Sequence, residues 1–238
     1  IMDCPLLNKN GPHLEKRLST LREHAVKTNK KWAKLLGIEP AAAITCVKPS
    51  GTVSQLTNSA SGIHPRHSQY YIRTVRADNK DPLTKFMRQA DVFNEPDVMS
   101  PEHNTVFSFP IKYSNKAVFR KDLSAVEHMQ LWLTYSEHWC EHKPSITISV
   151  KEHEWMDVGA WCYAHFDQLS GISFLPYSDH SYRQAPYQEC TKEEYEELYK
   201  NTPKTIDWDK LNEFETEDNT KASQELACTA GVCEIVDI

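Results

Sequence analysis

A short loop near the start of the chain carries residue types that bind phosphate. It follows an apolar run and consists of Lys48, Pro49, Ser50, Gly51, Thr52, Val53 and Ser54. A turn that leaves a strand and enters a helix points unpaired backbone N–H groups and the positive end of the helix dipole at a bound anion. Gly51 lets the backbone approach closely, and Lys48 adds a positive charge. The pattern indicates a phosphate site, with an ordinary helix-capping turn as the alternative. It lacks the spacing of a Walker P-loop.

Two cysteines near the end of the chain have a spacing suited to reversible disulfide chemistry. Cys228 and Cys233 lie five positions apart with Gly231 between them, so they can close a small disulfide where the backbone turns. The segment from Leu211 to Cys228 is polar, and as a random coil its ends would lie roughly 20–25 Å apart. That reach would let the pair move between an active site and an external reductant. Incidental surface thiols, or half of a zinc site, are the alternatives.

Other histidines and cysteines give weaker signals. His138 and His142 stand four positions apart on a predicted helix, a spacing that can bind a metal, but no third ligand is evident. Cys140 and Cys162 lie among apolar residues, where a thiol usually behaves as a small hydrophobic side chain. We therefore expect no metal site, and we expect both cysteines to lie in the core.

Alternating helices and strands are predicted to position these groups. Apolar periodicity and a following glycine predict a helix over residues 13–36, and capping boxes begin helices at Ser124 and Thr191. Further helices are predicted over residues 53–60 and 154–169. The predicted strands are residues 43–47, 69–76, 105–111, 146–150 and 172–175. This order indicates an α/β protein with its body at residues 1–211 and a flexible redox tail at 212–238.

Composition narrows the classes of function. The chain has 238 residues and a net charge of -6, so it can form a sizeable core but lacks the basic surface that nucleic acid polymers require. No apolar run approaches the roughly 20 residues of a membrane span, and no signal peptide is evident. Seven cysteines without an export signal fit reduced thiols. We therefore expect a cytoplasmic protein. Because residues 1–7 do not read as the start of a domain, we expect part of a longer or divided protein.

Five segments, in this order, resemble the C-terminal third of adenosylcobalamin-dependent (class II) ribonucleoside-triphosphate reductases. They are residues 44–56 (ITCVKPSGTVSQL), 61–67 with 70–73 (SGIHPRH and YYIR), 172–176 (ISFLP), 184–189 (QAPYQE) and the Cys228/Cys233 pair. The long segments are specific, whereas the iron-dependent reductases carry a similar terminal dithiol. The choice of the cobalamin class rests on residues 62–73 and 172–189.

The resemblance implies a fold and a chemistry. The chain would be the C-terminal portion of a ten-stranded α/β barrel, in which adenosylcobalamin homolysis turns a finger-loop cysteine into a thiyl radical. That radical takes the 3′ hydrogen of the ribose of a ribonucleoside triphosphate. The 2′ hydroxyl then leaves as water while two barrel cysteines become a disulfide. The resemblance assigns the substrate phosphates to the 48–54 loop. It makes Cys228 and Cys233 the shuttle that reduces this disulfide and is restored by thioredoxin.

The chain also departs from such a reductase. It contains no Asn-x-Cys-x-Glu finger-loop motif, so a larger N-terminal reductase chain would have to supply that cysteine and complete the barrel. No residue is assigned to cobalamin: His64 or His67 could be an axial ligand, but either could also cap a turn or meet phosphate. Two other hypotheses remain open. One is a noncatalytic redox or assembly subunit that docks thioredoxin, and the other is a self-sufficient nucleotide hydrolase.

Overall fold

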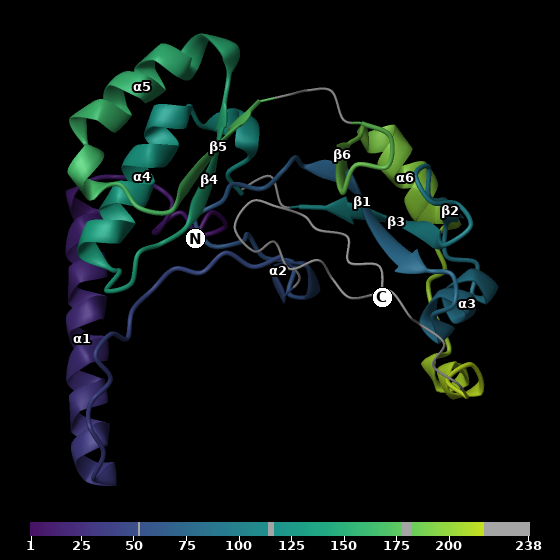
Figure 1. Ribbon diagram of the computed structural model, residues 1–238, viewed down its shortest axis with the longest axis horizontal. Helices are drawn as coiled ribbons and strands as arrows, with labels where there is room; N and C mark the ends of the chain where they lie inside the picture. The colour runs from purple at the N-terminus through teal and green to yellow at the C-terminus, as the bar shows by residue number, and fades with distance from the viewer. Residues whose placement is uncertain (52, 114–116, 178–181, 217–238) are drawn as a thin grey trace. The chain divides into compact units, whose positions relative to one another are not determined.

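The computed structural model describes residues 1–51, 53–113, 117–177 and 182–216, which fall into two compact units (Figure 1). The described residues of the first unit are those up to 69 together with those from 113 to 177. The second unit takes residues 70–112 and then the described residues from 182 onward. The chain therefore leaves the first unit after residue 69 and returns to it at residue 113.

The first unit is built around helix α4. Its α-helices are α1 (Pro12–Leu36), α2 (Val53–Leu56), α4 (Ala125–His138) and α5 (Trp155–Ala164). Strand β4 (Ile146–Val150) pairs in parallel with β5 (Ile172–Pro176). Short 3₁₀ turns lie at η1 (Arg120–Asp122), η2 (Glu152–Glu154) and η3 (Phe166–Gln168). Because α4 contacts α1, β4 and α5, the core of the unit forms on its apolar face.

The sequence explains why these elements form where they do. The capping box predicted for α4 is confirmed, since the Ser124 hydroxyl accepts from the Glu127 amide and the Glu127 carboxylate accepts from the Ser124 amide. Helix α1 ends at Gly37, whose φ of 68° suits a glycine. In β4, Ile146, Ile148 and Val150 alternate into the core. Figure 1 shows the second half of α1 extending past the end of α4.

The second unit is an antiparallel sheet with helices packed against it. Its strand order is β2-β3-β1-β6, with β1 (Tyr70–Asp78), β2 (Asn94–Pro96), β3 (Asn104–Lys112) and β6 (Tyr187–Glu189). Helix α6 (Lys192–Asn201) contacts β1 and β3. Helix α3 (Pro82–Gln89) contacts the 3₁₀ turn η4 (Trp208–Glu213), where the Phe86 ring meets those of Trp208 and Phe214. No described helix is long and apolar enough to span a membrane.

The strand predicted at residues 43–47 is wrong. This segment pairs with no strand among the described residues, and the residues that follow α4 satisfy its backbone instead. One carboxylate oxygen of Glu141 accepts from the amides of Ile44, at 2.7 Å, and Thr45, at 3.1 Å. The Trp139 indole donates to the Cys46 carbonyl. Apolar, β-branched residues favour an extended backbone, but a strand also needs a neighbour to pair with.

Two predicted helices are shorter than expected. The helix predicted over residues 53–60 is the single turn α2, because Asn58 has a φ of 47° and the Ser59 amide turns back to the Ser54 carbonyl. The helix predicted over residues 154–169 ends at Ala164, and a 3₁₀ turn follows it. The strands predicted near 69–76, 105–111, 146–150 and 172–175 are confirmed within a few residues.

Candidate phosphate loop and its supports

The 48–54 loop rests on the segment that follows α2. The Ser50 amide donates to the Ser61 hydroxyl at 2.6 Å. Gly62 has a φ of 55°, and a Cβ atom there would lie 3.2 Å from the Lys48 carbonyl oxygen and 3.4 Å from the Pro49 Cα. Gly62 is therefore required both for its backbone conformation and for the close approach of the loop. The predicted loop thus has a support that depends on Ser61 and Gly62.

Two serines shape the loop from within. The Ser54 amide donates to the Ser50 hydroxyl at 2.9 Å, and the Ser54 hydroxyl donates to the Ser50 carbonyl at 3.0 Å. Both predicted site residues therefore already hold the turn that begins α2. Lys48, Pro49, Gly51 and Val53 are exposed, and Thr52 lies outside the described residues. An anion would be met first by the exposed members of the loop.

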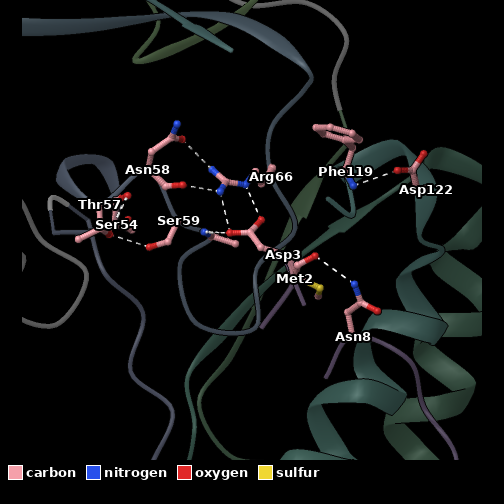
Figure 2. A network of polar contacts seen from close by, with 11 residues as sticks. Met2, Asp3, Asn8, Ser54, Thr57, Asn58, Ser59, Arg66, Phe119 and Asp122 are labelled. Atoms are coloured by element: carbon pink, nitrogen blue, oxygen red, sulfur yellow. Dashed lines mark hydrogen bonds and ion pairs between the residues drawn. The ribbon is translucent and has the colours of Figure 1, made fainter. Parts of the chain in front are cut away.

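The buried side chain of Arg66 holds the segment that follows α2 (Figure 2). The Arg66 guanidinium donates to the two oxygens of the Asp3 carboxylate, each at 2.6 Å, and to the Asn58 carbonyl at 2.6 Å. The Ala60 amide donates to the same carboxylate, and the guanidinium lies 3.5 Å from the centroid of the Tyr113 ring. Arg66 is thus committed to holding the start of the chain against the end of α2.

That contact also acts on the pKa of Asp3. Partial burial alone would raise the pKa of this carboxyl, but the hydrogen bond from Arg66, supported by the one from Ala60, brings it below its ordinary value. Residue types did not indicate this pair, because Asp3 lies far from Arg66 in the chain and the 61–67 motif does not name a partner for its arginine. Only the fold brings them together.

His64 connects the support of the loop to the parallel strands. Its Nε2 accepts from the Thr147 amide of β4 at 3.0 Å, and its Nδ1 lies 3.0 Å from the Ser61 carbonyl. Burial lowers the pKa of this imidazole, and the hydrogen bond to Ser61 opposes that change only in part. Because both ring nitrogens have partners, His64 does not fit an axial cobalt ligand.

Two further histidines of this unit are also held neutral by burial. His128 of α4 donates from Nε2 to the Ile63 carbonyl at 2.7 Å, and burial lowers its pKa to about 4. Burial, together with the nearby charge of Arg120, lowers the pKa of His67 to about 4. No contact of these rings identifies a cobalamin ligand, so the described residues leave that cofactor unassigned.

A cavity of about 280 Å³ lies beside the loop. Its lining includes Pro49 and His64, together with the residues at the start of β4 and β5. The Ser170 hydroxyl is buried and has no hydrogen-bond partner among the described residues. The cavity therefore joins one edge of the 48–54 loop to polar groups at the ends of two parallel strands.

The other candidate residues have separate outcomes. Cys228 and Cys233 lie outside the described residues, so the dithiol stays a prediction. Cys140 is buried, and burial raises its pKa to about 11, whereas Cys162 packs at the margin of the core with its pKa also raised by burial. The described residues contain no cluster of three or more His, Cys, Asp or Glu side chains that could hold a metal ion. His138 instead pairs with the Ser19 hydroxyl.

Comparison with known proteins identifies several related reductases. No family model matches the chain. The adenosylcobalamin-dependent ribonucleoside-triphosphate reductase of Euglena gracilis is 28% identical over 200 residues, which are 83% of this chain and 27% of that protein. The reductase of Lactobacillus gasseri is 25% identical over 228 residues, 94% of this chain and 30% of its own. A probable reductase of the same kind from Dictyostelium discoideum is 29% identical over 87% of this chain and 27% of its own.

A solved structure agrees with these relatives. The crystal structure of a B12-dependent, class II ribonucleotide reductase matches 88% of this chain and 30% of its own, with a TM-score of 0.75 and 24% identity. The mixed α/β fold is therefore that of part of a class II enzyme. The chain spans less than a third of the length of the relatives described here. Over that stretch, the chain is homologous to the adenosylcobalamin-dependent, class II ribonucleotide reductases.

Proposed function

We propose that this chain is the part of a ribonucleoside-triphosphate reductase that receives the substrate phosphates and carries the electron-shuttling dithiol. The observation that carries the proposal is the match of 83–94% of the chain to the reductases of Euglena gracilis and Lactobacillus gasseri. In this proposal the chain acts in the cytoplasm. It forms the C-terminal portion of a ten-stranded barrel that a larger N-terminal chain completes with the finger-loop cysteine.

The supports of the 48–54 loop are consistent with a phosphate role. A loop that binds a charged group must keep its donors in place before the ligand arrives, so that ordering them does not weaken binding. Ser50, Ser61 and Gly62 provide such a framework, while Lys48 and Gly51 stay exposed. The cofactor of the complete enzyme would be adenosylcobalamin, which supplies the radical chemistry when bound.

The terminal cysteines would return two electrons in each turnover. A thiolate of Cys228 or Cys233 attacks the barrel disulfide to form a mixed disulfide, and the second cysteine then releases it. The barrel regains two thiols, the tail becomes a disulfide, and the dithiol of thioredoxin reduces the tail in the same way. Electrons pass from thioredoxin to the tail, then to the barrel, and finally to the substrate, whose 2′ hydroxyl leaves as water.

The dithiol is tested by turnover with two different reductants. The chain is mixed with the larger reductase chain, adenosylcobalamin and a ribonucleoside triphosphate, and the deoxy product is measured. Cys228→Ser and Cys233→Ser should each reduce thioredoxin-driven turnover by about 100-fold or more, because the shuttle needs both thiols. Both variants should keep turnover driven by a small dithiol such as dithiothreitol. Cys162→Ser is the control and should behave as wild type with either reductant.

The loop is tested by Ser50→Ala in the same assay. Loss of the hydroxyl that holds the Ser54 amide should raise KM for the triphosphate by about tenfold, which corresponds to about 1.4 kcal/mol. Ser59→Ala is the matched control, since the Ser59 hydroxyl lies 2.8 Å from that of Thr57 and makes no hydrogen bond to the described residues of the loop. Unchanged kinetics in Ser50→Ala, with loss of function in the cysteine variants, would instead favour the noncatalytic redox subunit.

A further inference from the structure

We propose that His64 is a positioning residue which, as a neutral imidazole, ties the 48–54 loop to strand β4, and that its protonation releases the loop. The tie itself is independent of what the loop binds. Its consequence for ligand binding rests on the function proposed above.

The tie is a chain of contacts that begins in the loop and ends in the parallel strands. The Ser50 amide donates to the Ser61 hydroxyl, and Gly62 packs closely against the Lys48 carbonyl. The Ser61 carbonyl in turn meets Nδ1 of His64, and Nε2 of the same ring meets the Thr147 amide. Thr147 belongs to β4, which pairs with β5 and contacts α4. The imidazole thus links the loop support to an ordered part of the core.

The chemistry of the two contacts fixes the protonation state of the ring. A backbone amide can only donate, so the Nε2 that faces Thr147 must carry a lone pair. A backbone carbonyl can only accept, so the proton of the neutral ring lies on Nδ1, facing Ser61. Adding a second proton would place two N–H groups head to head at Thr147. Protonation of His64 therefore breaks one contact of the tie.

The surroundings of His64 contain little that would stabilise an imidazolium. From α4, the ring of His128 faces it edge-on, with the two ring centroids 6.4 Å apart. The 48–54 loop contributes Lys48 as its only titratable residue, and β4 and β5 carry none. The cavity lining beside the ring has no carboxylate. We therefore expect the loop to be released at a pH below the ordinary histidine pKa, because burial lowers the pKa of His64.

The tie is tested by amide hydrogen exchange in the full chain. At pH 7.5, His64→Ala should increase exchange at the Thr147 and Ser50 amides by about tenfold relative to wild type. His24→Ala, which removes an exposed histidine of α1, should leave both amides unchanged. In wild type and in His24→Ala, lowering the pH should open the Thr147 amide with the same midpoint as the NMR titration of the His64 ring. Exchange is corrected for its intrinsic pH dependence.

A neutral replacement separates the tie from general packing. The Gln side chain does not titrate and its carbonyl can accept from Thr147, so His64→Gln should restore protection and remove the pH-dependent opening. If the Thr147 amide stays protected in His64→Ala, or while the wild-type ring titrates, the proposal is overturned. Where His64→Ala does not fold, the wild-type titration and His64→Gln still decide between these outcomes.

Binding of inorganic triphosphate separates this inference from the proposed function. If both hold, His64→Ala should bind triphosphate about tenfold more weakly than wild type and His24→Ala at pH 7.5. If the amide results hold but no variant binds triphosphate, the tie stands and the phosphate role of the loop fails. If wild type and His64→Ala bind equally, His64 does not position the loop for ligand, and that part of the inference is overturned.

Discussion

At the scale of single residues, the stability of the first unit depends most clearly on the ion pair between Arg66 and Asp3. The guanidinium is almost fully buried, with 7% of its side chain exposed, whereas the carboxylate retains 33%. Removing one member of such a pair leaves the other charge without a partner in a poorly solvated site. Because Arg66 also bonds to Asn58, the pair couples the first residues of the chain to the turn after α2.

Asp3→Asn tests this coupling. The substitution keeps the size of the side chain but removes the charge opposite Arg66, so the free energy of unfolding should fall by about 2–3 kcal/mol at pH 7. Because the pKa of Asp3 is lowered in the folded state, its contribution is present above the unfolded value near 3.9 and disappears as the pH falls through the folded value.

The measurement is urea unfolding of wild type and Asp3→Asn at several pH values. The difference between them should be constant near neutral pH and shrink below about pH 4. Asp209→Asn, an exposed carboxylate in the 3₁₀ turn after α6, is the control and should change stability by less than about 0.5 kcal/mol. A loss in Asp3→Asn that is no greater than in the control would contradict the coupling.

Residue types alone predicted a turn at 48–54, because Gly, Lys and hydroxyl residues are typical of anion-binding turns, and phosphate binding there stays a proposal. They could not predict its supports. Gly62 matters because the fold packs it against the Lys48 carbonyl, and His64 matters because the fold places its ring beside the Thr147 amide. The dithiol at Cys228 and Cys233 stays a prediction from spacing and resemblance.

At the scale of elements, two helices begin with the same device but contribute differently to the core. Ser124 heads α4, which buries residues along most of its length, while Thr191 heads α6, which has no fully buried residue. Both hydroxyls accept from the amide of the glutamate three positions later. A cap stabilises only the end of a helix, so its effect on the global free energy of unfolding depends on how much of the core that helix forms.

Ser124→Ala and Thr191→Ala test that difference. Each change should remove about 1 kcal/mol of helix stability. In α4 this loss should appear in the global free energy of unfolding, whereas in α6 it should appear chiefly as faster amide exchange in the first turn. Chemical denaturation and hydrogen exchange measure the two effects. Equal global losses in both variants would show that α6 is as integral to folding as α4.

Elements whose bonding is local were predictable from the sequence, and so were four strands, but not the one extended run whose partner is not a strand. The capping boxes of α4 and α6 and the glycine end of α1 depend on neighbours in the chain. The extended run at 43–47 depends instead on what lies beside it, which here is Glu141 and Trp139 rather than a strand. The sequence therefore predicted the extended backbone but not its partner.

At the scale of the whole molecule, the first unit has apolar surface that its own described elements do not cover. Helix α5 is apolar around its circumference, yet Met156 and Tyr163 are 84% and 88% exposed, and Phe166 after it is 74% exposed. A helix of this composition is typically buried inside a larger protein. Parallel sheets are usually covered on both faces by other elements. The parallel sheet in the described residues consists of two strands, β4 and β5.

This surface predicts how the chain behaves alone. We expect it to self-associate at micromolar concentration and to bind a hydrophobic dye, because exposed apolar patches of this kind mark interaction sites. A Met156→Glu, Tyr163→Glu double variant should reduce both effects. Size exclusion with light scattering measures association, and Glu152→Gln at an exposed site of the same region is the control. A compact monomer with a cooperative melt would count against a divided reductase.

The path of the chain through its two units also sets an order for folding. Residues 1–69 hold α1 and the 48–54 loop, but α4 and β4, which complete their core, follow residue 112. The Arg66 amide, for instance, bonds to the Val118 carbonyl. During synthesis, residues 1–69 therefore stay incompletely packed until all of residues 70–112 have left the ribosome and α4 follows.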